Sequence, residues 1–177
     1  MNKKSDNEFE LLWDLPRLPL TECIGKPKDA SRFCYDQELV IDSRTGHVQL
    51  KYQIDPKILY QKKSYSFRTG LSSSARHGVS SFLEFLRKLS GGNIFSSIVD
   101  IGGNDLYLAK HLKSYGNQVA VVDPVCEEYD GQIIDEITVI GRLIEHVDLS
   151  NDIQKPDLVV CRHTLEHISN PEKLIRQ

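Results

Sequence analysis

The sequence lacks the features that would place it in several common classes of protein. No apolar run approaches the length of a membrane-spanning helix, and the N-terminal residues lack the apolar stretch of a signal peptide. The four cysteines form no C-x-x-C pair and no spacing typical of a disulfide framework or a zinc site. The formal net charge of -3 does not favour a general binder of nucleic-acid phosphates. We therefore expect a cytoplasmic protein with reduced thiols, no bound metal, no membrane association and no nucleic-acid partner.

Composition and pattern indicate a small N-terminal lobe followed by a larger domain. The 177 residues are 40% hydrophobic and 27% charged, as in ordinary soluble globular proteins. We expect a lobe over residues 1–60, a connector and first helix over 61–90, and an α/β domain over 91–177. The lobe is expected to be irregular because prolines resist strands and helix interiors, with two short strands around the turn Ser43–Gly46.

After residue 90, short apolar strands alternate with helical segments. Strands are expected over residues 98–101, 118–123, 142–148 and 156–161, and helices over 79–89, 106–115 and from 170 onward. This alternation predicts a Rossmann-like α/β fold with a largely parallel sheet. Ligands of such sheets bind beyond the carboxyl ends of the strands.

The stretch SIVDIGGNDLYLAKHL carries the first functional signal. Its strand runs into Gly102 and Gly103 and then directly into a helix, so backbone N–H groups can approach a ligand closely. Asp123 ends the next strand, 21 positions after Gly102, where a carboxylate suits a ribose diol. A nucleoside-containing ligand is therefore predicted, although a plain tight turn with Asp123 as a strand-end cap is the alternative. NAD is disfavoured because Tyr107 stands where the dinucleotide motif has its third glycine.

Two longer segments carry a family resemblance. IVDIGGNDLYLAKHLKSYGNQVAVVDP and PDLVVCRHTLEHISNPEKLI resemble the glycine-rich motif, the acidic motif and the fourth-strand segment of class I S-adenosylmethionine-dependent methyltransferases. IGGND is similar to the form found in C-methyltransferases of deoxysugar pathways. LPLTE, TGHVQL and LYQKKSYSFRTGLSSSARHG are similar to the N-terminal lobe and connector of those enzymes. The resemblance implies S-adenosylmethionine as cofactor and methyl transfer to a small-molecule acceptor, such as a sugar.

The resemblance also implies roles for residues at the ends of the first three strands. Gly102, Gly103 and Asn104 would lie along the methionine part of the cofactor. Asp123 would hold the ribose hydroxyls. Asp148, at the end of the expected third strand, resembles the acid that contacts the adenine amino group.

Further cofactor residues are implied after the fourth strand and in the connector. Cys161, Arg162 and His163 would lie near the sulfonium. Tyr65 and His77 match connector positions that pack near the cofactor.

Candidate catalytic groups follow the fourth strand. His163 and Glu166 are candidates for a general base, which needs hydrogen-bond reach to the acceptor and a suitable pKa. His163, Glu166 and His167 do not form an H-E-x-x-H metal site, because the glutamate precedes the second histidine instead of following the first. The alternative for His167 is a packed helix residue bonded to nearby backbone.

The sequence departs from the sugar C-methyltransferase pattern at two places. Leu106 stands where that subfamily has a glycine, which predicts a stiffer loop or an altered cofactor pose. Asp42–His47 stands where the family has the zinc ligands Cys-x-x-Cys-Gly-His, and the upstream cysteine pair is absent too. A zinc-free lobe is therefore expected.

The expected sheet contains only the first four of the seven strands that the resemblance implies. We expect the chain to be a fragment or a degenerate gene product, with an exposed apolar strand edge through which copies could associate. A second interpretation is a non-catalytic remnant that binds cofactor or serves as a partner module. A third, a nucleotide-dependent oxidoreductase, is disfavoured by the missing glycine.

Overall fold

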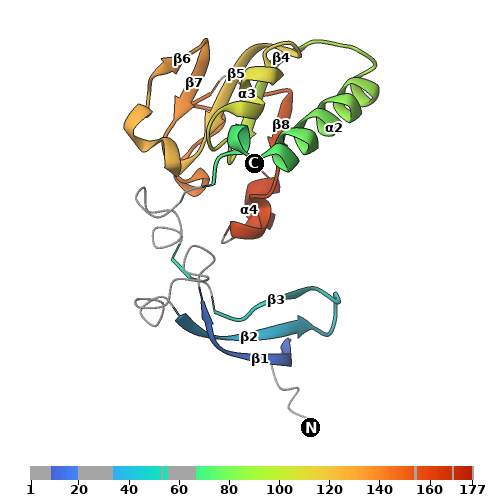
Figure 1. The fold of residues 1–177 in the computed structure, drawn as a ribbon, viewed down its shortest axis with the longest axis vertical. Coiled ribbons are helices and arrows are strands. Elements are labelled where there is room, and N and C mark those ends of the chain that lie inside the picture. The colour runs from blue at the N-terminus through green and yellow to red at the C-terminus, as the bar shows by residue number, and fades with distance from the viewer. Residues whose placement is uncertain are drawn as a thin grey trace. The chain divides into compact units, whose positions relative to one another are not determined.

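A computed structural model describes residues 9–19, 34–52, 54–55, 67–153, 155–168 and 170–176 (Figure 1). The chain divides into two compact units, residues 1–66 and residues 67–177. Within the described ranges, no helix is long and apolar enough to cross a membrane.

The first unit contains a three-stranded antiparallel sheet. Its strands are β1 (Phe9–Pro19), β2 (Cys34–Asp42) and β3 (Val48–Leu50), in the order β1-β2-β3. The two strands predicted around Ser43–Gly46 are confirmed as β2 and β3. β1 was not expected, because its sequence contains prolines. The register of β1 against β2 shifts between Leu15 and Leu18, so Pro16 lies where the pairing is interrupted. Its lack of a backbone N–H group therefore removes no hydrogen bond between the strands.

A carboxylate holds the turn between β2 and β3. Asp42 Oδ1 accepts the backbone N–H groups of Arg44 (2.8 Å) and Thr45 (3.1 Å). These bonds, that from Arg44 foremost, hold the pKa of Asp42 below its ordinary value. Gly46 has a φ of +75°, and the ladder closes where Asp42 N donates to His47 O (2.8 Å). The turn at Asp42–His47 is therefore built from hydrogen bonds to its first residue.

The second unit is built around a five-stranded sheet. Its strands are β4 (Phe95–Ile101), β5 (Gly116–Val122), β6 (Ile133–Ile134), β7 (Ile137–Ile140) and β8 (Leu158–Cys161). The order is β6-β7-β5-β4-β8, with β4, β5, β7 and β8 parallel and β6 antiparallel to β7. The predicted Rossmann-like α/β fold is confirmed. β8 forms one edge of this sheet in the described part of the chain, and association of copies through it stays a prediction.

The third parallel strand differs from the prediction. It is β7 (Ile137–Ile140), whereas residues 142–148 contain the short 3₁₀ helix η5 (Ile144–His146). Ile144 and Val147 are both buried, and their spacing of three residues fits one helical turn better than the two-residue period of a strand.

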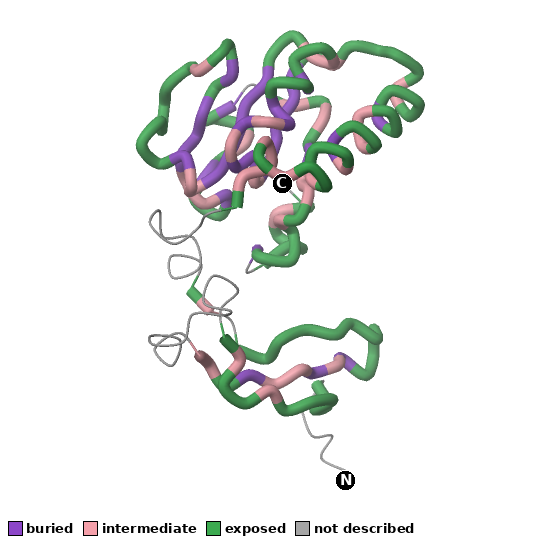
Figure 2. Tube along the Cα trace, viewed as in Figure 1, coloured by how far each residue is buried: buried purple, intermediate pink, exposed green. Residues whose placement is uncertain are grey.

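Helices and short turns cover the two faces of the sheet with separate apolar clusters (Figure 1, Figure 2). On one face lie α2 (Ser73–Ser90), which begins six residues before the helix predicted over 79–89, and α3 (Tyr107–Leu112), which lies within the helix predicted over 106–115. The second cluster includes residues around η5 and α4 (Pro171–Ile175), and α4 confirms the helix expected from residue 170. Because both faces are covered, the central strands read as continuous apolar runs.

The strand order places the glycine turn at a switch point of the topology. From β4 the chain moves to β5 and then β7 on one side, and it returns to the other side of β4 for β8. In open parallel sheets, the crevice beyond the carboxyl ends at such a point is the usual ligand site. Gly102 and Gly103 follow β4 directly at that place.

Leu106 combines a buried side chain with a backbone conformation suited to glycine. It precedes α3 with a φ of +61°, and it is 8% exposed. Left-handed backbone costs about 1–2 kcal/mol for a residue with a Cβ. Leu108, inside α3 and 7% exposed, has no such conformation. The two leucines therefore form a matched pair, alike in burial and different in backbone.

We expect the glycine variant to be more stable than the alanine variant at position 106, and less stable than the alanine variant at position 108. Leu106→Gly should unfold with a free energy about 1 kcal/mol above that of Leu106→Ala, because glycine relieves the positive φ. Leu108→Gly should be about 1 kcal/mol less stable than Leu108→Ala, as in any helix interior. Urea unfolding followed by circular dichroism measures all four. The same ranking at both positions would contradict the left-handed assignment.

Candidate functional site

The two glycines are required by packing within the protein. Gly102 has a φ of +80°, and a Cβ placed on it would lie 1.9 Å from Thr164 Oγ1. A Cβ on Gly103 would lie 2.6 Å from Val121 Cγ1. The turn thus packs against β5 on one side and against the segment after β8 on the other. Thr164 was missed by the sequence analysis, since nothing local marks it as a neighbour of Gly102.

Asp123 is joined directly to the glycine turn, so the structure brings together the two main predicted features. Its Oδ2 accepts the backbone N–H of Asn104 (2.8 Å), and its Oδ1 accepts that of Val125 (2.8 Å). The residue is 7% exposed, and burial raises its pKa in spite of these bonds. Each carboxylate oxygen retains a second lone pair, so the group can still accept ligand hydroxyls.

Asp100 is a buried acid that the sequence analysis missed. It lies in β4, is 2% exposed, and its Oδ2 has no hydrogen-bond partner among the described residues. Burial, and then the negative charge of Asp123, raise the pKa of Asp100 to about 7, while Arg162 opposes the shift. The available signal was a single acid inside the apolar run SIVDI. Two buried acids side by side are typical of a functional site.

Asn104 holds the centre of the turn. Its backbone carbonyl accepts a bond from the Cys126 thiol (3.1 Å), and its Nδ2 donates to Phe67 O (3.1 Å). Burial, and then the charge of Asp123, raise the pKa of Cys126 to about 12, so this thiol stays protonated. Asn104 Oδ1 is buried without a partner in the described part of the chain. Together with Asp100 Oδ2, it is an acceptor suited to a ligand that carries N–H or O–H donors.

Asp148 is not at the end of a strand, which corrects the prediction. It follows η5, is exposed, and accepts bonds from Ser150 N (2.9 Å), Ser150 Oγ (2.5 Å) and Asn151 Nδ2 (2.6 Å). The bonds to Ser150 foremost hold the pKa of Asp148 below its ordinary value. The carboxylate thus stabilises its own turn in this structure.

The segment after β8 lies beside the glycine turn. Cys161 pairs with Ile101, the last residue of β4, and burial raises its pKa, followed by the charges of Glu166 and Asp100. The guanidinium of Arg162 lies 5.0 Å from the ring centroid of Phe82, so it packs on α2.

The other predicted residues are more exposed. His163 is exposed with a φ of +53°, and Glu166 is exposed in η6 (Leu165–His167). His77 is exposed on α2. Tyr65 lies outside the described residues.

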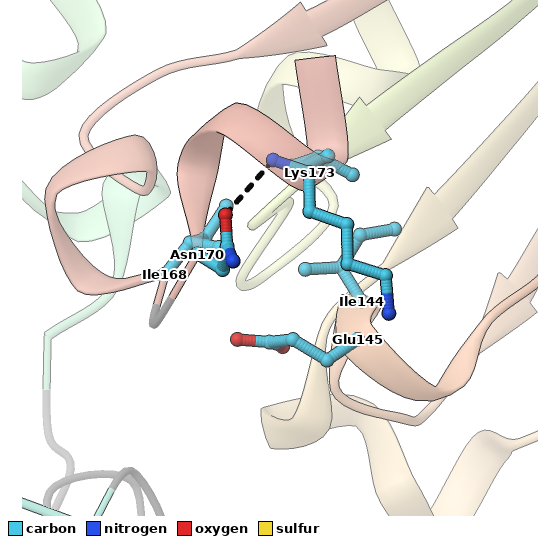
Figure 3. A pocket seen from close by; sticks show the side chains of 6 residues that line it. Ile144, Glu145, Ile168, Asn170 and Lys173 are labelled. Carbon is cyan, nitrogen blue, oxygen red and sulfur yellow. Dashed lines mark hydrogen bonds between the residues drawn. The ribbon is translucent and has the colours of Figure 1, made fainter. Parts of the chain in front are cut away.

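A small pocket lies among residues that follow β7 and β8 (Figure 3). It is lined by Ile144, Glu145, Ile168, Asn170, Lys173 and Leu174. Asn170 Oδ1 accepts the backbone N–H of Lys173 (2.9 Å), which fixes the start of α4 at its rim. None of these residues belongs to the predicted cofactor set, so the candidate site remains at the glycine turn and Asp123.

Comparison with known families supports methyl transfer as the general function. Residues 70–177 match the family described as a methyltransferase domain. The chain belongs to this family. The match and the Rossmann-like sheet identify a class I S-adenosylmethionine-dependent methyltransferase, an enzyme that transfers a methyl group. No curated protein matches the chain significantly.

The close packing at Gly102 leads to a prediction with an internal control. Gly102→Ala should lower the free energy of unfolding by about 2–4 kcal/mol, from the positive φ and the clash with Thr164. Gly131→Ala should cost only about 1 kcal/mol, because Gly131 has a similar φ of +76° and no atom of the described residues lies within 4 Å of its Cβ position. Urea unfolding compares them. Equal losses would show that Thr164 does not press on Gly102.

Asp100 should make stability depend on pH. Because the pKa of Asp100 is higher in the folded than in the unfolded protein, the protonated side chain favours the folded state. This contribution to the free energy of unfolding is complete below the unfolded pKa and is lost as pH rises through about 7. Between roughly pH 5 and pH 8, the wild-type protein should lose about 3 kcal/mol more than Asp100→Asn, which cannot ionise. Urea unfolding across this range tests it. Parallel pH profiles of the two proteins would mean that Asp100 is already ionised in the fold.

Proposed function

We propose that this chain binds S-adenosylmethionine at the carboxyl edge of its parallel sheet and transfers the methyl group to a small-molecule acceptor. The bond between the buried Asp123 carboxylate and the glycine turn, at the switch point of the strand order, carries the proposal. Asp100 Oδ2 and Asn104 Oδ1, which have no hydrogen-bond partner among the described residues, add to it, because a bound ligand could supply their donors. The residues present therefore suit a ligand with both a ribose and an ammonium group.

Each residue of the turn has a distinct part in this proposal. Asp123 accepts the ribose hydroxyls through its remaining lone pairs, and Gly102, Gly103 and Asn104 lie along the methionine part. Asp100 and Asn104 offer buried acceptors to that part. When bound, the cofactor supplies a methyl group made electrophilic by its positively charged sulfur. Methyl transfer needs mainly correct placement of the two reactants.

The molecule that accepts the methyl group is proposed to bind beside the segment that follows β8. His163 and Glu166 are exposed there and are within three positions of each other, so either side chain can meet a small molecule from solvent. We propose one of them as the general base for an acceptor hydroxyl or carbon acid, with a sugar as the acceptor class. The similarity of IGGND and the connector to sugar C-methyltransferases supports that class. Cys161 and Arg162 belong to the same side, next to the end of β4.

A titration with S-adenosylhomocysteine tests the cofactor site. Wild-type protein should bind it, and Asp123→Ala should weaken binding about 100-fold, because two charged hydrogen bonds are lost. Glu84→Ala, which removes an exposed acid on α2, is the control and should bind as the wild type does. Isothermal titration calorimetry measures all three, with NAD as the competing nucleotide.

The outcomes separate the interpretations. Binding of S-adenosylhomocysteine but not NAD supports the proposal and disfavours an oxidoreductase. Binding without methyl transfer to any of a panel of sugar nucleotides would favour a cofactor-binding module that lacks catalysis. A folded wild-type chain that does not bind S-adenosylhomocysteine would refute the cofactor assignment.

A further inference from the structure

A short segment before α2 lies against the glycine turn. This segment, residues 67–71, contains the 3₁₀ helix η3 (Thr69–Leu71) and is called the strap here. None of its residues is buried, so it has no apolar core of its own to fix its position. Its position must therefore depend on polar contacts with neighbouring elements.

One of these contacts is to Asp105. Asp105 Oδ2 accepts the backbone N–H of Gly70 at 2.7 Å, across 35 positions of sequence. The fit is close: a Cβ placed on Gly70 would lie 3.1 Å from the same oxygen and 3.2 Å from Tyr107 Cδ2. On the other side, Arg76 Nη1 donates to Gly70 O at 2.7 Å. Gly70 is thus held from both its N–H and its carbonyl.

The strap also reaches the residues of the proposed cofactor site. Phe67 O accepts a bond from Asn104 Nδ2, and the backbone N–H of the same Asn104 holds Asp123. Arg68 Nη1 donates to the same Phe67 carbonyl at 2.8 Å, and its positive charge opposes the rise that burial, foremost, causes in the pKa of Asp123 and Cys126. A displaced strap would therefore remove a positive charge from beside the buried Asp123 carboxylate.

We propose that Asp105 is a positioning residue that holds the strap as one wall of the cofactor site, with Arg68 placed beside Asp123. The proposal rests on the proposed function, because the wall matters only if the cofactor binds there. Asp105 itself touches no reacting atom. It acts through the Gly70 N–H, and an amide oxygen in its place could accept the same bond.

Two variants of Asp105 separate positioning from a general loss of structure. In Asp105→Ala, the Gly70 amide should exchange with solvent about tenfold faster, and affinity for S-adenosylhomocysteine should fall about tenfold. Asp105→Asn should restore both to within about threefold of the wild type, since it keeps an acceptor. Hydrogen exchange by NMR and calorimetry on the full chain supply the two measurements.

Asp157→Ala is the matched control. Its carboxylate also accepts backbone N–H groups, from Ser96 (2.8 Å) and Ser97 (2.9 Å), but at the opposite end of β4. This variant should lower stability and leave both Gly70 exchange and ligand affinity unchanged. Equal effects of Asp157→Ala and Asp105→Ala on affinity would overturn the proposal.

A cycle with Arg68→Ala tests whether Asp105 acts through the strap. Arg68→Ala should weaken S-adenosylhomocysteine binding while Gly70 exchange stays as in the wild type. In the double variant, the fold-increase in Kd should be smaller than the product of the fold-increases in the two single variants. A fold-increase equal to that product would mean that the two residues act independently, and it would overturn the proposal. If Asp105→Ala lacks a cooperative unfolding transition, Arg68→Ala carries the test, and an unchanged affinity overturns it.

The remaining outcomes distinguish this proposal from the proposed function. Unchanged Gly70 exchange in folded Asp105→Ala would refute the tether even if the ligand binds. Faster exchange with unchanged affinity would refute the strap as a wall of the site. Absence of binding by the wild type would refute the proposed function and the wall together, while Gly70 exchange would still show whether Asp105 holds the strap.

Discussion

The hydrogen bond from the backbone N–H of Asn104 to the Asp123 carboxylate joins the ends of two neighbouring strands, and the site depends on it. It fixes the turn after β4 against the loop after β5, in an environment where burial already raises the pKa of the acid. Asn104 then extends the connection outward, because its side chain holds Phe67 and its carbonyl accepts the Cys126 thiol. One residue thus links three separate segments around the edge of the sheet.

The site concentrates features that are unfavourable for folding. Gly102, Asn104 and Leu106 all have positive φ within five residues, and two of them carry a Cβ. Asp100 and Asp123 are both buried acids, and the pKa of Asp100 is raised by burial and then by the negative charge of Asp123. Strained backbone and shifted pKa values collect where a protein binds or reacts, because the surrounding core holds them there. Here that core is the pair of apolar clusters on the two faces of the sheet.

Much of the fold was predictable because its signals are local. The alternation of short apolar runs with helical spacing predicted the parallel sheet, and α2 has both a serine at its start and a glycine at its end. The third strand was placed wrongly, since ITVI and RLIEHV are both short and apolar and only their burial distinguishes a strand from a helical turn. β1 was missed because it contains two prolines, of which Pro16 lies where the pairing is interrupted and Pro19 is the last residue of the strand, and local sequence cannot reveal these positions.

Part of the candidate site was also predictable from the sequence, and part was visible only in the structure. The sequence alone determined the pairing of Gly102 and Gly103 with Asp123, because the carboxyl ends of adjacent parallel strands must meet at one edge. Only the tertiary structure decided that Thr164 fills the space beside Gly102, that Asp100 Oδ2 is buried without a partner in the part of the chain that is described, and that Asp105 holds Gly70. These contacts join residues 35 or more positions apart in two cases. Their existence depends on how the sheet and its loops pack, and no local pattern encodes that packing.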